Sequence, residues 1–262
     1  MLCTPMQTVD QAAIEAMPAL RVIAVAGAGA DAVDERAAGR RGIELLTAGE
    51  ALVETTADLA FGLIIAACRR LHDVETTLRE GRWQGWRFDQ TFGRDVHGAT
   101  LGLVGFGRIA RAVARRADGF GMRVLHHARH PSGQAGWREH LDELLEESEI
   151  ISLHVPLTGA TLGLIDRRRI ALMRPGAVLV NTARGAVVDE DALASALEEG
   201  RLSAAGLDVY VGEPAVSPRL LAAPRTVLLP HVGSATAATR EAMLRLAAEK
   251  LAGFLSVGGS SR

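Results

Sequence analysis

Short apolar runs alternate with longer amphipathic stretches along most of this 262-residue chain. One unit starts at the apolar run 101–104, continues through 108–119 with apolar residues at helical spacing, and ends at the run 122–125. Strand-length runs joined by amphipathic helices are typical of βαβ units in a parallel sheet. The pattern continues with strands expected at 150–155, 178–180, 205–209 and 227–229 and helices near 139–148, 189–199 and 235–255. It predicts an α/β fold with a doubly wound parallel sheet.

A glycine-rich turn joins the strand at 101–104 to its helix, and it reads Gly105-Phe106-Gly107-Arg108-Ile109-Ala110. A GxGxxG-type string between a strand and a helix is typical of dinucleotide-binding loops. Gly105 permits the tight turn, Gly107 lets the backbone approach a pyrophosphate, and Ala110 is small enough for the helix to pack on the strand. The helix N-terminus offers N–H groups and a positive dipole to phosphates. We therefore expect a dinucleotide cofactor at this turn.

The end of the next strand bears on which dinucleotide binds. NAD sites usually place Asp or Glu there, about 20 residues past the glycines, where the acid binds the ribose hydroxyls. Here Ala128 takes the place of the acid, and Arg129 and His130 follow it as candidates to pair with a 2′-phosphate. This favours NADP(H), with NAD(H) as the alternative cofactor. A second interpretation of Arg129, as an ordinary surface arginine, stays open because Lys250 is the only lysine and arginine is used throughout.

Three polar residues each follow an apolar run in the second half of the chain. Arg184 comes after AVLVNTA, Glu213 lies in LDVYVGEP, and His231 ends TVLLPH. Ligands of parallel sheets bind at the carboxyl ends of the strands, so we expect these side chains to converge on one cleft. The trio suits reduction of a 2-keto acid: the arginine holds the substrate carboxylate, the histidine protonates the ketone oxygen, and the carboxylate keeps the histidine charged and oriented. Each residue taken alone could equally cap a strand.

A second glycine-rich turn, Gly27-Ala28-Gly29, follows the apolar run 22–25. Asp31 comes soon after these glycines, and a carboxylate at that place would sit badly with a pyrophosphate. We expect the backbone around Ala26, Gly27 and Ala28 to offer N–H groups to the substrate carboxylate instead. An ordinary turn between a strand and a helix is the alternative.

From about Pro18 to about Gly253, the chain resembles the D-isomer-specific 2-hydroxyacid dehydrogenases. The resemblance is to the glyoxylate/hydroxypyruvate reductase and 2-ketogluconate reductase branch especially. The motifs that carry the resemblance are TTADLAFGLIIAACRR, GRDVHGATLGLVGFGRIA, HVPLTGATLGLID, LVNTARGAVVDEDALASAL, AAGLDVYVGEP and LLPHVGSAT. By this resemblance Arg184 is similar to the substrate-binding arginine, Glu213 to the acid that pairs with the histidine, and His231 to the proton donor. The resemblance also implies cofactor contacts at Thr56, Val155, Pro156, Thr182, Ala183, Asp208 and Gly233, with Asp208 beside the nicotinamide carboxamide.

The resemblance implies two domains. Residues 98–234 would form a Rossmann dinucleotide-binding domain, inserted in a flavodoxin-like substrate domain made of 1–97 and 235–262. Family members normally begin with a further βαβ segment, so the substrate domain is expected to be truncated and to lack its first strands. The strand candidates at 2–4, 22–25 and 43–46 would then be the contiguous strands three to five of a 2-1-3-4-5 order, with one edge exposed.

The aromatic segment GRWQGWRFDQTFGRDVHG lies between these domains. In the family this region helps to build a dimer arm, which implies a homodimer with Trp83, Trp86 and Phe88 at its interface. Ordinary packing in the core or cleft is the alternative for these aromatic residues. The polar tail, 256–262, is expected to be loose.

Composition narrows the partners. Apolar residues make up 48% of the chain, charged residues 23%, and the net charge is −2, which describes a folded α/β protein without a basic field for nucleic acid. Cys3 and Cys68 indicate reduced thiols in a cytoplasmic protein. The apolar run 59–68 is too short to span a membrane and is interpreted as the buried face of a helix that connects the domains. Three histidines lack the spacing of zinc ligands, so no metal is expected: His126, His127 and His154.

These features predict NADPH-dependent reduction of a small 2-keto acid, such as glyoxylate or hydroxypyruvate, to the D-2-hydroxy acid. Two alternatives remain. One is a cofactor-sensing regulator on the same fold, because fold does not fix function. The other is an inactive, truncated product.

Overall fold

The computed structural model describes residues 1–90 and 92–258, with side chains through residue 256. The chain forms two compact units, Met1–Thr55 with Ser234–Arg262 and Thr56–Gly233. The last four residues of the tail that we expected to be loose lie outside the described residues. Each unit has its own parallel sheet, as the alternation of apolar runs and amphipathic stretches predicts.

The larger unit is built on a seven-stranded sheet in the order β10-β9-β8-β7-β4-β5-β6, and every pair of neighbours is parallel. Its strands are β4 (Thr100–Val104), β5 (Arg123–His127), β6 (Trp137–Arg138), β7 (Ile150–Leu153), β8 (Ala177–Asn181), β9 (Leu202–Leu207) and β10 (Thr226–Leu228). The chain runs outward from β4 through β5 to β6, and then returns to β7 on the other side of β4. The strand order therefore reverses between β4 and β7, and such a switch point is where doubly wound sheets bind ligands.

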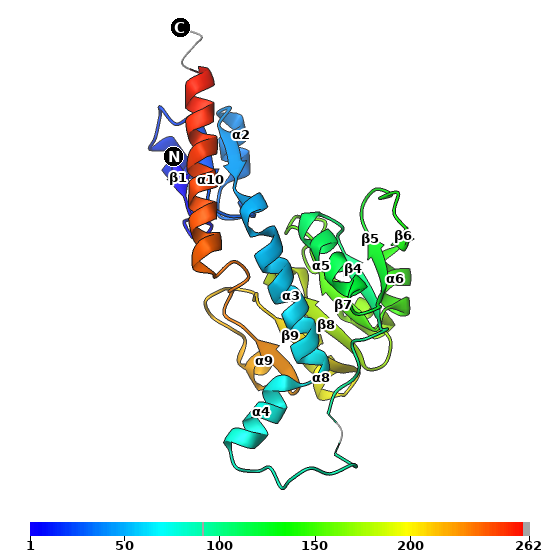
Figure 1. Ribbon diagram of the computed structural model, residues 1–262. Coiled ribbons are helices and arrows are strands. Elements are labelled where there is room, and N and C mark those ends of the chain that lie inside the picture. Colours follow the sequence, from blue (N-terminus) through cyan, green and yellow to red (C-terminus); the bar gives the residue numbers. More distant parts are fainter. Residues whose placement is uncertain (91, 259–262) are drawn as a thin grey trace. The chain divides into compact units, whose positions relative to one another are not determined.

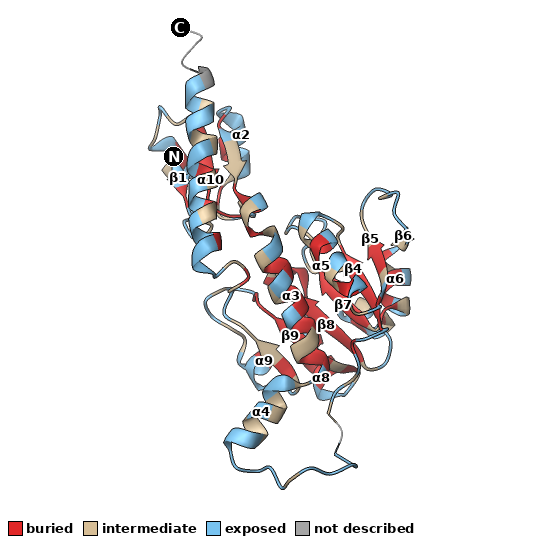
Figure 2. Ribbon diagram, viewed as in Figure 1, coloured by how far each residue is buried: buried red, intermediate tan, exposed pale blue. Residues whose placement is uncertain are grey.

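Helices flank this sheet, with α5 and α6 beside β4 and β5 in Figure 1. Strands β4, β7 and β8 are buried along their whole length, which Figure 2 shows in red. Central strands of a parallel sheet are covered on both faces, and this explains their nearly continuous apolar sequence. The helical elements of this unit are α3 (Val53–Cys68), α4 (Leu71–Arg79), α5 (Arg108–Asp118), α6 (Leu141–Glu147), α7 (Arg167–Leu172), η2 (Gly185–Val187), α8 (Glu190–Glu198) and α9 (Pro218–Ala222).

The smaller unit contains a three-stranded parallel sheet in the order β1-β2-β3, so the three strands are contiguous as expected. Its elements are β1 (Leu2–Cys3), α1 (Gln11–Glu15), β2 (Val22–Val25), α2 (Glu35–Arg40), β3 (Glu44–Thr47), η1 (Gly49–Leu52) and α10 (Ala237–Gly258). Helix α10 packs along the sheet through Ala247, which joins a buried cluster with Ala24 and Ala26. The Nζ atom of Lys250 binds the Thr47 carbonyl oxygen at 2.7 Å and fastens the helix to the end of β3.

The boundary between the units differs from the one that we predicted at residues 97 and 98. Residues 56–97 belong to the larger unit, because helix α3 packs on its sheet. The Cα of Gly206 in β9 faces Leu63 so closely that an added Cβ would lie 3.2 Å from the Leu63 Cβ. The Phe61 ring lies 4.8 Å from that of Phe120.

Helix α3 and the η1 turn before it form a longer apolar element than the sequence suggested. Together they span Gly49–Cys68, which is long and apolar enough to cross a membrane by length and composition alone. The expectation of a run too short to span was therefore wrong for the element as a whole. Half of this segment is buried inside the protein, as in the core helix of a folded domain. Helix α3 itself starts in the smaller unit and continues into the larger one, as expected of a connecting helix.

Candidate active site

A carboxylate and an imidazole meet beyond the carboxyl ends of β9 and β10. The Nδ1 atom of His231 lies 2.6 Å from Oε2 of Glu213. The other oxygen of that carboxylate, Oε1, accepts a hydrogen bond from the Tyr210 backbone N–H at 2.9 Å. The Glu213 side chain keeps 21% of its surface exposed and the His231 side chain 44%. The pair is thus oriented from the carboxylate side, while the imidazole remains accessible.

The turn that carries His231 is held by Asp208, a buried residue directly after β9. Its two oxygens accept the backbone N–H groups of Val232 at 2.7 Å and of Gly233 at 2.8 Å. Burial raises the pKa of Asp208, and the two backbone donors oppose that shift. His231 itself adopts a left-handed backbone conformation with φ of 54°.

Tyr210 connects the loop of Glu213 to the turn of His231. Its buried hydroxyl lies 2.9 Å from the carbonyl oxygen of Leu229, two residues before His231. Burial raises the pKa of Tyr210 to about 12, so the hydroxyl stays a donor at ordinary pH. The backbone of the same residue binds Glu213, and Tyr210 therefore fixes both members of the pair.

Arg184 follows β8 in a tight local turn. The Asn181 side chain accepts the Ala183 N–H at 2.9 Å and donates to the Arg184 carbonyl oxygen at 2.9 Å. Arg184 is half-buried and extended, and its Nη1 donates to the Ala183 carbonyl at 2.7 Å. The next residue, Gly185, abuts the Tyr210–Val211 peptide so closely that an added Cβ would lie 2.0 Å from the Tyr210 carbonyl carbon. The segment of Arg184 and the loop of Glu213 are therefore in direct backbone contact.

A further carboxylate reaches the same loop. Oε1 of Glu190, in the first turn of α8, accepts the Val211 N–H at 2.7 Å. Burial raises the pKa of Glu190, and the charge of Glu213 adds to the shift. Glu190 and Glu213 thus accept the two successive backbone N–H groups of Tyr210 and Val211.

The glycine-rich turn before α5 has the features of a pyrophosphate cradle. Gly105 has φ of 89°, and an added Cβ would lie 2.6 Å from the His154 carbonyl oxygen, so only glycine fits. Gly107 is exposed, and no described atom lies within 4 Å of a Cβ added to it. It directly precedes helix α5, an eleven-residue helix whose N-terminus no described side chain caps. An anion at this helix N-terminus would meet free N–H groups and a favourable dipole. The residues fit a dinucleotide.

Other predicted cofactor residues lie around the same carboxyl edge. Thr56 donates to the Gly233 carbonyl oxygen at 3.2 Å, and an added Cβ on Gly233 would lie 3.2 Å from Asp208 Oδ2. The Thr182 hydroxyl is buried and has no hydrogen-bond partner in the described part of the chain, which leaves it available to a ligand. Val155 lies against the Gly105 turn. Ala183 is buried, and of the remaining predicted contacts Ile109 is half-buried and Pro156 is exposed.

The end of β5 carries the residues that we expected to select the cofactor. Ala128 is half-buried, whereas Arg129 and His130 are exposed. The buried ring of His126 stacks on Phe106 of the glycine turn, with centroids 3.7 Å apart, and its Nε2 lies 2.5 Å from the Ser132 hydroxyl. The loop that bears Arg129 is thereby attached to the phosphate-binding turn. Burial lowers the pKa of His126, which keeps this link uncharged near neutral pH.

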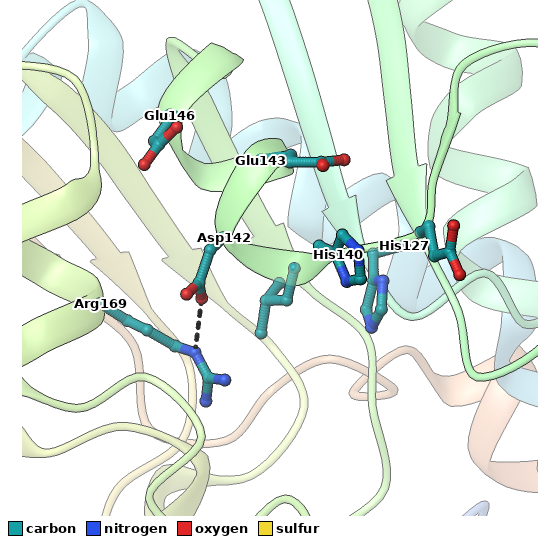
Figure 3. A pocket seen from close by; sticks show the side chains of 8 residues that line it. His127, His140, Asp142, Glu143, Glu146 and Arg169 are labelled. Atoms are coloured by element: carbon teal, nitrogen blue, oxygen red, sulfur yellow. Dashed lines mark hydrogen bonds and ion pairs between the residues drawn. The ribbon is translucent and has the colours of Figure 1, made fainter.

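A polar hollow lies beside these residues at the N-terminus of α6. Figure 3 shows its lining: His127, Glu139, His140, Leu141, Asp142, Glu143, Glu146 and Arg169. Asp142 lies 3.1 Å from Arg169, and the hydrogen bond from Arg168 lowers its pKa. None of Arg184, Glu213 and His231 lines the hollow. Its acidic rim disfavours phosphate, so the glycine turn remains the place for a pyrophosphate.

The second glycine turn lies in the smaller unit and is well packed there. Gly27 is buried, its N–H bonds to the Val25 carbonyl at 2.8 Å, and Pro5 fills the space that a side chain would need. Ala26 is buried and Ala28 is exposed. The N–H of Gly27 is therefore already used, and a substrate role for this turn stays a prediction.

The exposed aromatic segment before β4 does not pack into the core. The exposed fractions are 57% for Trp83, 81% for Trp86 and 89% for Phe88. Core packing as the explanation for these residues is therefore wrong for the single chain.

In the described ranges, no group of three or more His, Cys, Asp or Glu side chains is placed to hold a metal ion.

Comparisons with known proteins show the family of this chain. The family model described as D-isomer specific 2-hydroxyacid dehydrogenase, NAD binding domain, matches residues 61–233. The chain belongs to this family. A glyoxylate reductase of Thermococcus litoralis is 43% identical over 255 residues, which cover 94% of this chain and 77% of the relative. The glyoxylate/hydroxypyruvate reductase B of Pectobacterium atrosepticum is 42% identical over 255 residues, which cover 95% and 80%.

Solved structures give the same result. The NADPH-dependent glyoxylate/hydroxypyruvate reductase of Sinorhizobium meliloti, in complex with NADP and malonate, superposes with a TM-score of 0.91 at 36% identity and covers 98% of this chain and 81% of that one. The protein is accordingly an NAD(P)-dependent oxidoreductase of the 2-hydroxyacid dehydrogenase family.

Sequence reasoning missed several residues that shape this candidate site. Tyr210, Asn181, Gly185 and Glu190 act through contacts between segments that are distant in the sequence. Asn181 had a detectable signal, since it is a polar residue at the end of a fully apolar strand. Glu190 had none, because acids in the first turn of a helix are common for reasons of the helix dipole alone.

Proposed function

We propose that this family member reduces a small 2-keto acid of the glyoxylate or hydroxypyruvate type to the D-2-hydroxy acid, with NADPH as the preferred reductant. The observation that carries the proposal is the 2.6 Å contact between His231 and Glu213, beside the segment that presents Arg184. The names of the relatives, glyoxylate reductase and glyoxylate/hydroxypyruvate reductase, support this substrate class.

Each residue has a distinct part in the reaction. A nicotinamide dinucleotide held at the turn of Gly105 and Gly107 would supply the hydride for the reduction. His231 has its Nδ1 on Glu213, so its Nε2 is the atom that donates a proton to the carbonyl oxygen. Glu213 orients the imidazole through its contact with Nδ1. The Arg184 guanidinium binds the substrate carboxylate and fixes the angle of the carbonyl. Positioning of this kind can lower a barrier by several kcal/mol, and about 7 in favourable cases.

Steady-state kinetics with NADPH and NADH against glyoxylate, hydroxypyruvate and 2-ketogluconate test the reaction. His231→Ala should lower kcat about a hundredfold, as loss of a general acid does. His97→Ala, an exposed histidine of the same unit, is the matched control and should keep wild-type kcat. If the wild type binds NADPH but turns over none of the three acids, the regulator hypothesis would be favoured instead.

NADPH preference rests on the end of β5. The strand end has no acid to hold a free ribose hydroxyl, and the exposed Arg129 lies on a loop attached to the phosphate-binding turn through His126 and Ser132. The double variant Ala128→Asp with Arg129→Ala should reverse the preference toward NADH, because the new carboxylate repels a 2′-phosphate and accepts from a ribose hydroxyl. A wild type that uses NADH at least as well would show that this assignment is wrong.

A homodimer is the second part of the proposal. Trp83, Trp86 and Phe88 together with Leu71 and Leu78 expose large apolar surfaces on one stretch of the chain, and such surfaces are typical of protein contacts. Sedimentation of the wild type should give a dimer, and Trp86→Ser with Phe88→Ser should shift it to monomer. A monomeric wild type at micromolar concentration would contradict the dimer.

The two cysteines support a cytoplasmic location. Cys3 and Cys68 are both free and buried. Burial raises the pKa of Cys68 to about 12, so its thiol is unreactive. Unpaired thiols are the usual state in a reducing compartment. Fractionation of the native host with antibody detection tests the location, and recovery of the protein outside the cytoplasmic fraction would contradict it.

A further inference from the structure

We infer that Glu190 is a positioning residue for the Glu213–His231 pair: it holds the Val211 N–H and so fixes the loop that presents Glu213. The inference rests on the proposed function, in which this pair delivers the proton. Glu190 touches neither member of the pair in the described contacts, and it acts through the backbone.

The Tyr210–Val211 segment is where this control is exerted. Its two successive N–H groups go to two different carboxylates: that of Tyr210 to Glu213 Oε1 at 2.9 Å, and that of Val211 to Glu190 Oε1 at 2.7 Å. The first bond ties the loop to the carboxylate that it presents. The second ties the loop to helix α8, six of whose nine residues are buried. Without the second bond the loop and Glu213 could move together.

Gly185 abuts the same peptide: an added Cβ would lie 2.3 Å from the Tyr210 carbonyl oxygen and 2.4 Å from the Val211 nitrogen. The peptide is therefore held both by this close backbone contact and by the Glu190 carboxylate. Both contacts come from the segment directly after Arg184. This segment sets the loop of Glu213 relative to the segment of Arg184, so one short stretch of chain positions the carboxylate-binding group and the proton-donating pair together.

An ordinary helix-capping role does not account for Glu190. Asp189 already caps α8 by accepting the Ala192 N–H at 2.9 Å. Asp191, the next acid, is exposed as first-turn acids usually are. Glu190 instead is half-buried and directs its oxygen away from its own helix, to a backbone donor 21 residues along the chain.

Three substitutions at this position separate positioning from charge. Glu190→Gln removes the charge and keeps an oxygen of the same reach, whereas Glu190→Asp keeps the charge and withdraws the oxygen by one methylene. Glu190→Ala removes both. If Glu190 acts by positioning, kcat should fall about tenfold in the Asp and Ala variants, which is the usual size for a lost hydrogen bond to a charged group. The fall in kcat should be much smaller in the Gln variant. In every variant the KM for the keto acid should change less than kcat. Asp191→Asn is the matched control and should keep wild-type kinetics.

A spectroscopic readout tests the inference without turnover. The hydrogen-bonded Nδ1 proton of His231 gives a low-field signal in proton NMR of the unliganded protein, assigned by its loss in His231→Ala. We expect this signal to persist in Glu190→Gln and to shift or broaden in Glu190→Asp and Glu190→Ala, at an unchanged melting temperature in Asp. The inference is overturned if kcat follows charge, with Asp like wild type and Gln impaired, or if the signal is the same in all variants. Failure of the proposed function would instead appear as an inactive wild type, and the NMR comparison would still decide the role of Glu190.

Discussion

The contact between Gly185 and the Tyr210–Val211 peptide makes one glycine decisive for the site. In Gly185→Ala the new Cβ would lie 2.0 Å from the Tyr210 carbonyl carbon, where ordinary contact between carbon atoms needs about 3.5 Å. The atoms that the new Cβ would meet belong to the Tyr210–Val211 backbone, and they cannot rotate away as the end of a flexible side chain can. The two segments must therefore separate by about 1.5 Å, divided between them.

This displacement is large on the scale of the chemistry. Glu213 lies three residues beyond Tyr210, and its Oε2 is 2.6 Å from His231 Nδ1. A shift of about 1 Å takes that pair out of the range of a good hydrogen bond, roughly 3.2 Å at most. Misplacement by about 1 Å commonly costs a hundredfold in rate, so we expect kcat of Gly185→Ala to fall by about that factor. Overpacking of this kind should also lower the free energy of unfolding by about 1–3 kcal/mol.

A second glycine provides the control. Gly62 is an exposed residue of helix α3, and no described atom lies within 4 Å of an added Cβ. Gly62→Ala should raise the free energy of unfolding by about 0.5–1 kcal/mol, as expected in a helix interior, and leave kcat unchanged. Urea unfolding and steady-state kinetics of both variants measure these effects. A Gly185→Ala variant with wild-type stability and turnover would show that the two segments are not in rigid contact, and the reasoning would fail.

Three further predictions concern other parts of the chain. Glu213→Gln removes the charged partner of His231 Nδ1 and should lower kcat about tenfold, the usual size for a lost hydrogen bond to a charged group; unchanged turnover would remove the proton-donor assignment. Gly105→Ala forces a positive φ and a 2.6 Å clash with the His154 carbonyl, and calorimetry should show cofactor affinity reduced at least tenfold, the result of a lost cradle. Burial lowers the pKa of His154 to about 4, so in the folded state it stays neutral while the unfolded chain takes up a proton below about pH 6.5. The contribution of neutral His154 to the free energy of unfolding is present above pH 6.5 and is lost as the pH falls toward 4. Between these pH values the melting temperature should therefore decline more steeply in wild type than in His154→Gln. Parallel curves of melting temperature against pH would contradict the lowered pKa.

The pattern of apolar positions was sufficient to predict every described strand except the short edge strand β6, because buried parallel strands leave short apolar runs bounded by polar residues. The runs at 101–104 and 22–25 correspond to β4 and β2 to within one residue. The position of Arg184, Glu213 and His231 after such runs was equally visible. Their roles remain predictions, since side-chain geometry alone does not report turnover.

Contacts between distant segments could not be predicted. The boundary of the larger unit was missed because the apolar positions of helix α3 do not tell which of the two sheets the helix covers. Glu190 and Tyr210 were missed because their partners, Val211 and Leu229, are reached through backbone groups that every residue possesses. Backbone hydrogen bonding leaves no mark on the identity of the acceptor or donor residue.

In the proposed function, the left-handed backbone of His231, with φ of 54°, sets the stability of the fold against turnover at one residue. A residue with a Cβ in that conformation costs roughly 1–2 kcal/mol relative to glycine, although histidine is among the types that tolerate it better. Random substitution followed by selection for folding alone would therefore favour glycine at this position. Among related sequences, glycine in place of this histidine would mark lineages that kept the scaffold after selection for proton transfer had ended.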